Sequence, residues 1–373
     1  MHRFHFFSIA VGFVTFAYSQ FGFAACPGSP PTGIQCVEPA STKEISAHST
    51  CKKVTNNHAS GNSLMVPVAT STEWSTFYGN LPSSVTTANC CFGTWTARDS
   101  NRAWYGVTTS SNGTKMAAVV YNGKIYTSAN SGSTWSVSAS ETKLWRNIAS
   151  SSTGTKLVAA SAGLTKVYTS TDSGANWVAQ SSNRSWTDVA SSSDGTKLVS
   201  VVNAGQIYTS TDSGVNWVAQ DSNRNWCGVA SSSDGVKLVA YVCSGQIYTS
   251  TDSGDNWTAR DSSRNWTDVA SSSDGTKLVA TVGGGRVYTS TDSGVTWTPQ
   301  DSNRNWVSVG SSSDGTKLVA SVGGGLVYVS IDSGVTWTER DSSRNWSGVA
   351  VSPDGAKAVV VVDGGQIYTS DCP

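Results

Sequence analysis

The sequence predicts an all-β protein built from seven copies of one unit of about forty residues. The period is visible in a tyrosine that precedes Thr-Ser or Val-Ser and recurs at spacings of 42, 40, 40, 40, 40 and 40 residues: Tyr126, Tyr168, Tyr208, Tyr248, Tyr288, Tyr328 and Tyr368. The segments between turns are rich in β-branched and aromatic residues, and no window has the apolar spacing of an amphipathic helix.

The clearest copy, from Asn265 to Trp297, shows how each unit is organised. Its extended segments are 266–270, 277–282, 286–291 and 295–298, separated by Ser-Asp-Gly-Thr, Gly-Gly-Gly and Asp-Ser-Gly, which are turn sequences. Four antiparallel strands within forty residues form one blade of a β-propeller. The sequence therefore predicts a seven-bladed β-propeller of four-stranded antiparallel blades over residues 92–373.

The two ends of the repeat region are complementary. Trp95 lies in the tail of a repeat whose head is missing, whereas the last copy stops at Asp371 with no tail. We expect the strand around Trp95 to complete the last blade, close the ring and remove its exposed edges. The same register brings Cys372 next to Cys90 or Cys91, and Cys91–Cys372 is the candidate disulfide that staples the ring.

The chain begins with a predicted secretory signal peptide over residues 1–25. Arg3 precedes an apolar run from Phe6 to Phe16, and small residues follow at Ala24 and Ala25. The run is too short for a transmembrane helix. Phe23-Ala-Ala-Cys26 is similar to a bacterial lipoprotein box, so a lipid anchor at Cys26 stays open beside plain secretion. Either way the protein is expected to be extracytoplasmic: secreted, periplasmic or at the cell surface.

Residues 26–91 are predicted to form a small cysteine-containing segment, either a plug or a spacer, before the propeller. Within the fourth repeat, Cys227 and Cys243 lie on consecutive strands of one hairpin, and we expect a disulfide between them. No Cys-x-x-Cys occurs and no histidine follows His58, so no metal or other cofactor is predicted. The formal net charge is zero with 13% charged residues, which disfavours a nucleic-acid partner.

The turn between the third and fourth strands carries a family resemblance. Ser170-Thr-Asp-Ser-Gly-Ala-Asn-Trp177 recurs along the chain, with Asn130 in place of the aspartate in the first copy; the aspartates are Asp172, Asp212, Asp252, Asp292 and Asp332. This resembles the Asp-box, or BNR repeat, of the sialidase-like propellers, a group that includes sortilin-type receptors and photosystem II assembly factors. The resemblance implies that these carboxylates stabilise turns and face away from any active site.

Sialidase chemistry is the weakest of the functional alternatives. The resemblance implies an arginine trio, a tyrosine nucleophile with a glutamate, and an aspartic acid as proton donor. The predicted ring has only two glutamates, Glu141 and Glu339, and every tyrosine within residues 92–373 except Tyr105, Tyr121 and Tyr241 is a repeat anchor. The arginine motif near the N-terminus of sialidases is absent. We therefore predict that the protein is not an enzyme and has no catalytic residues.

The loops between blades supply the candidate binding residues. Most read Asp-Ser-Asn/Ser-Arg, with a tryptophan two residues after the arginine. The arginines are Arg102, Arg184, Arg224, Arg264, Arg304 and Arg344, and the tryptophans are Trp104, Trp186, Trp226, Trp266, Trp306 and Trp346. One interpretation is structural: Asp and Arg pair within a turn and Trp packs between blades.

The other interpretation is a ring of repeated ligand pockets. Tryptophan can stack on a sugar while arginine binds hydroxyls, and several weak sites gain avidity on a multivalent surface. The main functional prediction is a non-catalytic module that binds glycans multivalently through this loop face. The alternative is a protein-binding scaffold or assembly factor. The near-identity of repeats three to seven favours glycan binding over this alternative, since a single protein partner is expected to select a lopsided patch.

Overall fold

The computed structural model describes residues 51–55, 63–67, 85–86 and 91–372, which fall into two compact units, Met1–Cys90 and Cys91–Pro373. In the first unit, β1 (Cys51–Thr55) pairs antiparallel with β2 (Ser63–Pro67) and with β3 (Val85–Thr86). The predicted signal peptide and Cys26 lie outside the described residues, as does most of the segment 26–91. Its predicted role as a plug or spacer stays a prediction.

The second unit is made of antiparallel strands. In chain order they are β4 (Thr96–Thr109), β5 (Met116–Gly123), β6 (Ile125–Ser128), β7 (Ser136–Val137), β8 (Lys143–Ser150), β9 (Leu157–Ser161), β10 (Thr165–Ser170), β11 (Val178–Arg184), β12 (Trp186–Ser191), β13 (Leu198–Val202), β14 (Gly205–Ser210), β15 (Val218–Arg224), β16 (Trp226–Ser231), β17 (Leu238–Val242), β18 (Ile247–Ser250), β19 (Thr258–Arg260), β20 (Trp266–Ser271), β21 (Leu278–Ser290), β22 (Thr298–Ser311), β23 (Leu318–Ser330), β24 (Thr338–Val351) and β25 (Lys357–Asp371). No helix among the described residues is long and apolar enough to cross a membrane.

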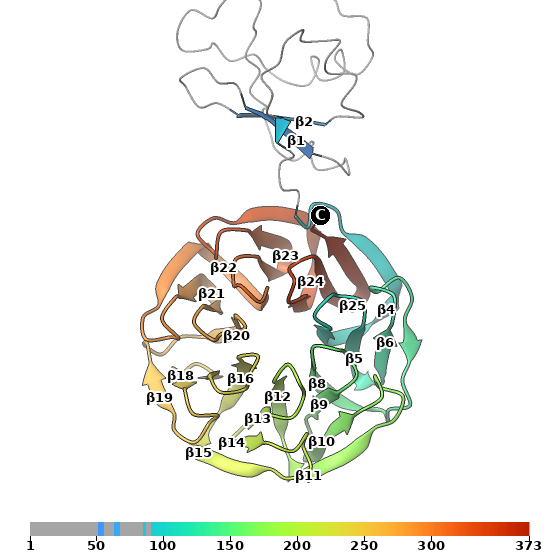
Figure 1. The fold of residues 1–373 in the computed structure, drawn as a ribbon, viewed down its shortest axis with the longest axis vertical. Coiled ribbons are helices and arrows are strands. Elements are labelled where there is room, and N and C mark those ends of the chain that lie inside the picture. The colour runs from blue at the N-terminus through green and yellow to red at the C-terminus, as the bar shows by residue number, and fades with distance from the viewer. Residues whose placement is uncertain (1–50, 56–62, 68–84, 87–90, 373) are drawn as a thin grey trace, which may run out of the picture. The chain divides into compact units, whose positions relative to one another are not determined.

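The sheets are arranged around a central axis, as Figure 1 shows. We number the sequence repeats 1 to 7 by the tryptophan that opens the first strand of each: Trp104, Trp145, Trp186, Trp226, Trp266, Trp306 and Trp346. First strands such as β12 and β16 lie nearest the axis, and fourth strands such as β15 and β19 lie at the rim. The sheet β12-β13-β14-β15 shows one repeat complete.

Several strands serve two neighbouring repeats, which is why some sheets are continuous. In β22, residues up to Asn305 pair with β21, and residues from Trp306 onward pair with β23. The last strand, β25, pairs with β4 through Tyr368↔Ala97 and Thr369↔Thr96, so the strand after Trp95 is a partner of the last repeat. Cys91 and Cys372, separated by 281 residues, form a disulfide beside this pairing.

The first-strand tryptophans form the core between repeats. All are between 0% and 2% exposed. Each indole meets the third-strand tyrosine of its own repeat edge-on, with ring centroids 5.1–5.4 Å apart. Trp226 also packs against Val199, Val201 and Ile207 of repeat 3. Burying such large apolar surfaces at each junction is the main force that holds neighbouring sheets together.

A chain of backbone hydrogen bonds links the turns between first and second strands. Ser111 N–H donates to Ser152 O at 2.8 Å, and the same bond recurs from repeat to repeat until Ser313 donates to Pro353 O at 2.8 Å. Asp354 N–H then donates to Ser111 O at 3.1 Å, which returns the chain of bonds to its start.

Candidate functional site

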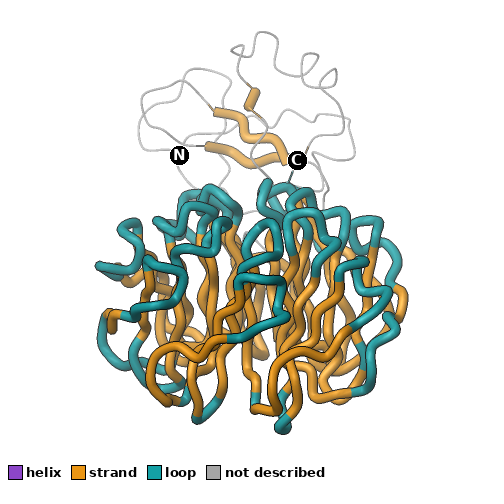
Figure 2. Tube along the Cα trace, turned by 60° about the horizontal axis from the view of Figure 1, so that its bottom comes forward, coloured by secondary structure: helices purple, strands orange, loops and turns teal. Residues whose placement is uncertain are grey.

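The turns of the second unit gather on two opposite faces (Figure 2). The loops with Asp-Ser-Asn/Ser-Arg lie beside the turns that follow the second strands, because Gly285 pairs with Arg304. We call this side the arginine face. The turns whose sequence resembles the Asp-box lie beside the turns between first and second strands, where Ser253 N–H donates to Val236 O at 2.9 Å. We call this side the Asp-box face.

Each candidate arginine is held by its own repeat. Arg264 forms an ion pair with Asp261 at 3.1 Å, and its guanidinium carbon lies 4.4 Å from the ring centre of Tyr288. The pattern is shared: five such ion pairs span 3.1–3.6 Å, and all six arginines stack over the third-strand tyrosine at 4.3–4.7 Å. For Arg184, Ser181 stands where the others have aspartate. These contacts give the arginines a bracing role.

The candidate tryptophans are buried too deeply to stack on a sugar. Their indoles are at most 2% exposed and pack between repeats. Stacking on a pyranose needs an accessible ring face, so this part of the predicted pocket is wrong in the structure. The cause is the register: the tryptophan pairs across to the second strand, as in Trp266↔Val282, and a bulge follows it. Ligand binding by the arginines themselves stays a prediction.

The aspartate carboxylates between the third and fourth strands stabilise turns. Asp252 Oδ1 accepts from Asn256 N–H at 2.9 Å and from the Ser250 hydroxyl at 2.8 Å, and Oδ2 accepts from Asn256 Nδ2 at 2.7 Å. The backbone N–H and hydroxyl of Thr296 bind the ionised form of Asp292 and lower its pKa to about 2. Asp172, Asp212 and Asp332 accept the equivalent backbone bond at 2.9 Å. This geometry is the architectural role that the turn sequence predicts.

One cluster on the arginine face breaks the repeat. Tyr105 and Tyr121, at 38% and 37%, are the most exposed aromatic side chains between residues 91 and 372. Arg146 donates from Nη1 to the Tyr105 hydroxyl at 2.9 Å, and its guanidinium lies 5.3 Å from each ring centre. The two rings are 5.9 Å apart. We call Tyr105, Tyr121 and Arg146 the Tyr-Arg cluster.

Sequence reasoning did not select the Tyr-Arg cluster, although two of its members stand out as tyrosines outside the repeat anchor. Tyr105 and Arg146 each follow the first-strand tryptophan. The other repeats have smaller residues there: Thr187, Cys227, Thr267, Val307 and Ser347. The sequence signal for the cluster is therefore the residue after the first-strand tryptophan, which is large in repeats 1 and 2 and smaller in the other five.

Asp188 and Tyr241 are buried near the axis, and Asp268 is half-buried. Burial raises the pKa of Asp188 to about 7, and the charge of Asp268 adds to the effect. Burial likewise raises the pKa of Asp268 to about 6. Tyr241 donates its hydroxyl to Thr267 O, and burial next to both carboxyls raises the pKa of this phenol well above its usual value. Asp188 also accepts from Val229 N–H of repeat 4, which ties two first strands together.

The second predicted disulfide, Cys227–Cys243, is present on the arginine face, with Cα atoms 5.5 Å apart. Among the described residues, no group of three or more His, Cys, Asp or Glu side chains is placed to hold a metal ion.

Solved structures share this architecture. YCF48 from Cyanidioschyzon merolae has a TM-score of 0.61 and 17% identity, over 74% of this chain and 98% of that one. YCF48 bound to D1 peptide has a TM-score of 0.60 and 15% identity, over 75% and 97%. The GH74 enzyme of Niastella koreensis has a TM-score of 0.57 and 20% identity, over 74% of this chain and 44% of that enzyme.

These likenesses show that the second unit has a β-propeller fold, and at this level of identity they show the fold alone. No protein-family model matches the sequence, and no curated protein matches it either.

Proposed function

We propose that this chain is a non-catalytic recognition protein that binds a protein or peptide partner on its arginine face, through the Tyr-Arg cluster. The observation that carries the proposal is the exposure of Tyr105 and Tyr121 at one point of an otherwise regular ring. Tyrosine and arginine are enriched where proteins bind proteins, because they combine apolar area with hydrogen bonding at low entropic cost.

The lopsided position of the cluster favours one partner over a multivalent glycan. Seven equivalent sugar sites would need an accessible aromatic in each repeat, yet the repeated tryptophans are buried. The candidate arginines are already engaged by tyrosine and, in five repeats, by aspartate. The solved complex of YCF48 bound to D1 peptide adds that a propeller of similar fold holds a peptide.

The proposal includes a closed, seven-bladed ring built on Asp-box turns. The pairing of β25 with β4, the returning chain of backbone bonds and the Cys91–Cys372 disulfide support closure. Two disulfides are typical of an oxidising compartment and support an extracytoplasmic location. A signal peptide over residues 1–25, with or without lipidation of Cys26, would bring the protein there.

The test compares peptide and glycan binding by matched variants. The double variant Tyr105→Thr, Tyr121→Asn carries the residues that repeat 3 has at these positions, Thr187 and Asn203, so the ring should be kept. Arg264→Gln serves as the control on the repeated loops. Each protein is applied to a random peptide array and to a glycan array.

We expect saturable peptide binding that falls about tenfold or more in the double variant and stays in the control, because truncating exposed aromatic anchors costs more than about 1 kcal/mol. Binding to glycans that falls in Arg264→Gln instead would reject the proposal in favour of the glycan-binding module. Release of shorter saccharides from the glycan array, followed by mass spectrometry, would reject the non-catalytic assignment.

A further inference from the structure

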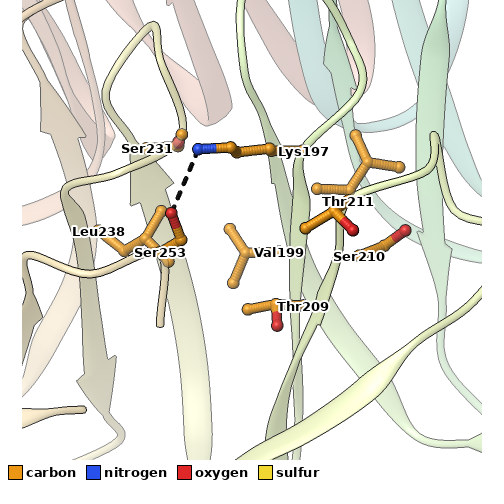
Figure 3. A pocket seen from close by; sticks show the side chains of 10 residues that line it. Lys197, Val199, Thr209, Ser210, Thr211, Ser231, Leu238 and Ser253 are labelled. Carbon is orange, nitrogen blue, oxygen red and sulfur yellow. Dashed lines mark hydrogen bonds between the residues drawn. The ribbon is translucent and has the colours of Figure 1, made fainter. Parts of the chain in front are cut away.

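The Asp-box face has a narrow crevice at the junction between repeats 3 and 4. Figure 3 shows it: Lys197 of repeat 3 reaches across and donates to Ser253 of repeat 4 at 3.3 Å, above Val199 and Leu238. The cavity there is about 10 Å³, which is too small for more than a single water. The crevice between repeats 2 and 3 has the same lining and also measures about 10 Å³.

The equivalent crevice between repeats 1 and 2 is a cavity of about 250 Å³. Its lysine is Lys115, which donates to Ser173 at 3.1 Å, and Met116 and Leu157 form an apolar floor. A volume just below the range of about 300–1,000 Å³ that suits drug-sized ligands fits a smaller molecule.

Truncated side chains in repeat 1 open this cavity. Ala117 stands where repeat 3 has Val199, and Ala129 stands where it has Thr211. In repeat 3 the Gln220 amide donates to Thr209 at 3.1 Å beside the crevice, whereas repeat 1 has the short Ser138 at that position. The outer strand is also shorter, since β7 has 2 residues and β15 has 7.

The same crevice lacks a carboxylate that the ordinary junctions have beside their lysine. At the ordinary junction, the Ser232 hydroxyl, the Val236 N–H and, more weakly, the charge of Lys197 lower the pKa of Asp234, so this ammonium and carboxylate interact. At three other junctions a lysine likewise helps to lower the pKa of the turn aspartate of the following repeat: Lys156 with Asp194, Lys237 with Asp274 and Lys277 with Asp314.

Lys115 has a neutral residue at the equivalent place, because Thr153 replaces the aspartate. Asn130, which lines the cavity, replaces the Asp-box aspartate. The junction between repeats 7 and 1 also lacks the turn aspartate, with Asn112 there, but its lysine, Lys357, pairs with Asp371 at 2.8 Å. The widened cavity thus keeps its cation, while the turn carboxylate that interacts with the lysine at the ordinary junctions is absent.

We propose that the crevice between repeats 1 and 2 is a binding site for a small organic anion, a carboxylate or a phosphate monoester. The Lys115 ammonium binds the charged group, and the hydroxyls of Thr134 and Ser136 donate to its oxygens. Met116 and Leu157 contact the carbon part of the ligand. A charged hydrogen bond in a partly enclosed site is about twice as strong as a neutral one, which is enough to select an anion over a neutral analogue.

The site lies on the face opposite the Tyr-Arg cluster and does not depend on the proposed partner. The test is isothermal titration calorimetry of the full chain with three probes: glycerol 3-phosphate, lactate and, as the neutral comparison, glycerol. We expect one or both anions to bind saturably and glycerol to show no heat above dilution. The anion that binds decides between the phosphate and the carboxylate class.

Variants then assign the site. Lys115→Met should weaken anion binding about tenfold or more, while the matched Lys197→Met in the narrow crevice should leave it unchanged. Ala117→Val and Thr153→Asp restore the residues of the other repeats, so both should fold, and both should abolish binding by filling the cavity or neutralising the lysine. No binding by either anion, equal binding of glycerol, or equal loss in Lys197→Met would overturn the proposal.

Discussion

Replacing Asp188 by asparagine should remove much of the pH dependence of stability of the propeller above about pH 4. Asp188 is 7% exposed and joins three repeats: it accepts from Asn147 Nδ2 of repeat 2, from Val189 N–H at 2.8 Å and from Val229 N–H of repeat 4 at 2.8 Å. Burial raises its pKa from 3.8 to about 7, with a further contribution from Asp268, and the three donors only partly offset this.

The sign follows from proton binding. Between pH 3.8 and about 7 the folded state binds a proton at Asp188 that the unfolded state has released, so the free energy of unfolding falls as pH rises and levels off above the folded pKa. At about 1.4 kcal/mol per pKa unit, the loss from pH 5 to pH 8 is about 3 kcal/mol at most. The turn aspartates act at the other end: Asp194 and Asp314, with pKa values of about 2, lose their stabilising effect only below about pH 4.

The assay is urea unfolding followed by tryptophan fluorescence, at several pH values from about 5 to 8. Wild type should lose stability as pH rises, and Asp188→Asn should show a flatter profile. At pH 5 the variant should be less stable by about 1–3 kcal/mol, because its amide N–H₂ faces backbone donors. Asp194→Asn, at an exposed turn with a low pKa, is the matched control and should keep the wild-type slope. Parallel profiles for wild type and Asp188→Asn would refute the reasoning and mean that the three donors keep the carboxylate ionised.

The turns, the arginine loops and the terminal disulfide give three more expectations. Asp252→Ala should lower the free energy of unfolding by about 1 kcal/mol, because an exposed turn loses its acceptor for Asn256 N–H. Peptide binding should be unchanged. Loss of peptide binding at full stability would place the ligand on the Asp-box face. A triple variant in which glutamine replaces Arg224, Arg264 and Arg304 should lose about 1 kcal/mol of unfolding free energy per site, because ion pairs and stacking on tyrosine are lost. Unchanged urea midpoints would contradict the bracing role. Cys372→Ser should lower the free energy of unfolding by a few kcal/mol on the chain-entropy model, because two residues 281 positions apart are no longer cross-linked in the unfolded chain. A melting temperature equal to that of wild type would contradict this.

The fold was predictable because each local signal repeats. The turn sequences, the strand alternation and the tyrosine spacing agree in most copies, so an ambiguity in one copy is resolved by the others. The terminal pairing of β25 with β4 and the Cys91–Cys372 disulfide also followed from the same register, since the tail around Trp95 fits only the last repeat. Four further features are part of the proposed function: the number of blades, the closure of the ring, the Asp-box turns and the signal peptide.

The candidate site was less predictable, because spacing gives a position in the repeat but not the side to which a side chain points. The tryptophan after each Asp-Ser-Asn/Ser-Arg loop stands at the start of an inner strand, and a bulge follows it, for example between Trp226 and Gly228. This bulge decides which of the neighbouring side chains faces solvent. A sequence pattern of period 2 fails at a bulge. The spacing therefore predicts a pocket position for a tryptophan that lies in the core, whereas Tyr105, one residue later in repeat 1, is the exposed side chain.

In a ring of similar repeats, the residues that differ are more informative about function than the residues that recur. Drift alone would scatter substitutions without coordinating them. In repeats 1 and 2, however, the changes are coupled in space: Ala117 opens a cavity at the same junction where Thr153 removes the carboxylate near Lys115. On the opposite face of these two repeats, Tyr105 and Arg146 occupy the same repeat position and contact each other. Both coupled sets therefore lie in repeats 1 and 2. A binding function confined to this sector would leave the other repeats free to remain near-identical structural units.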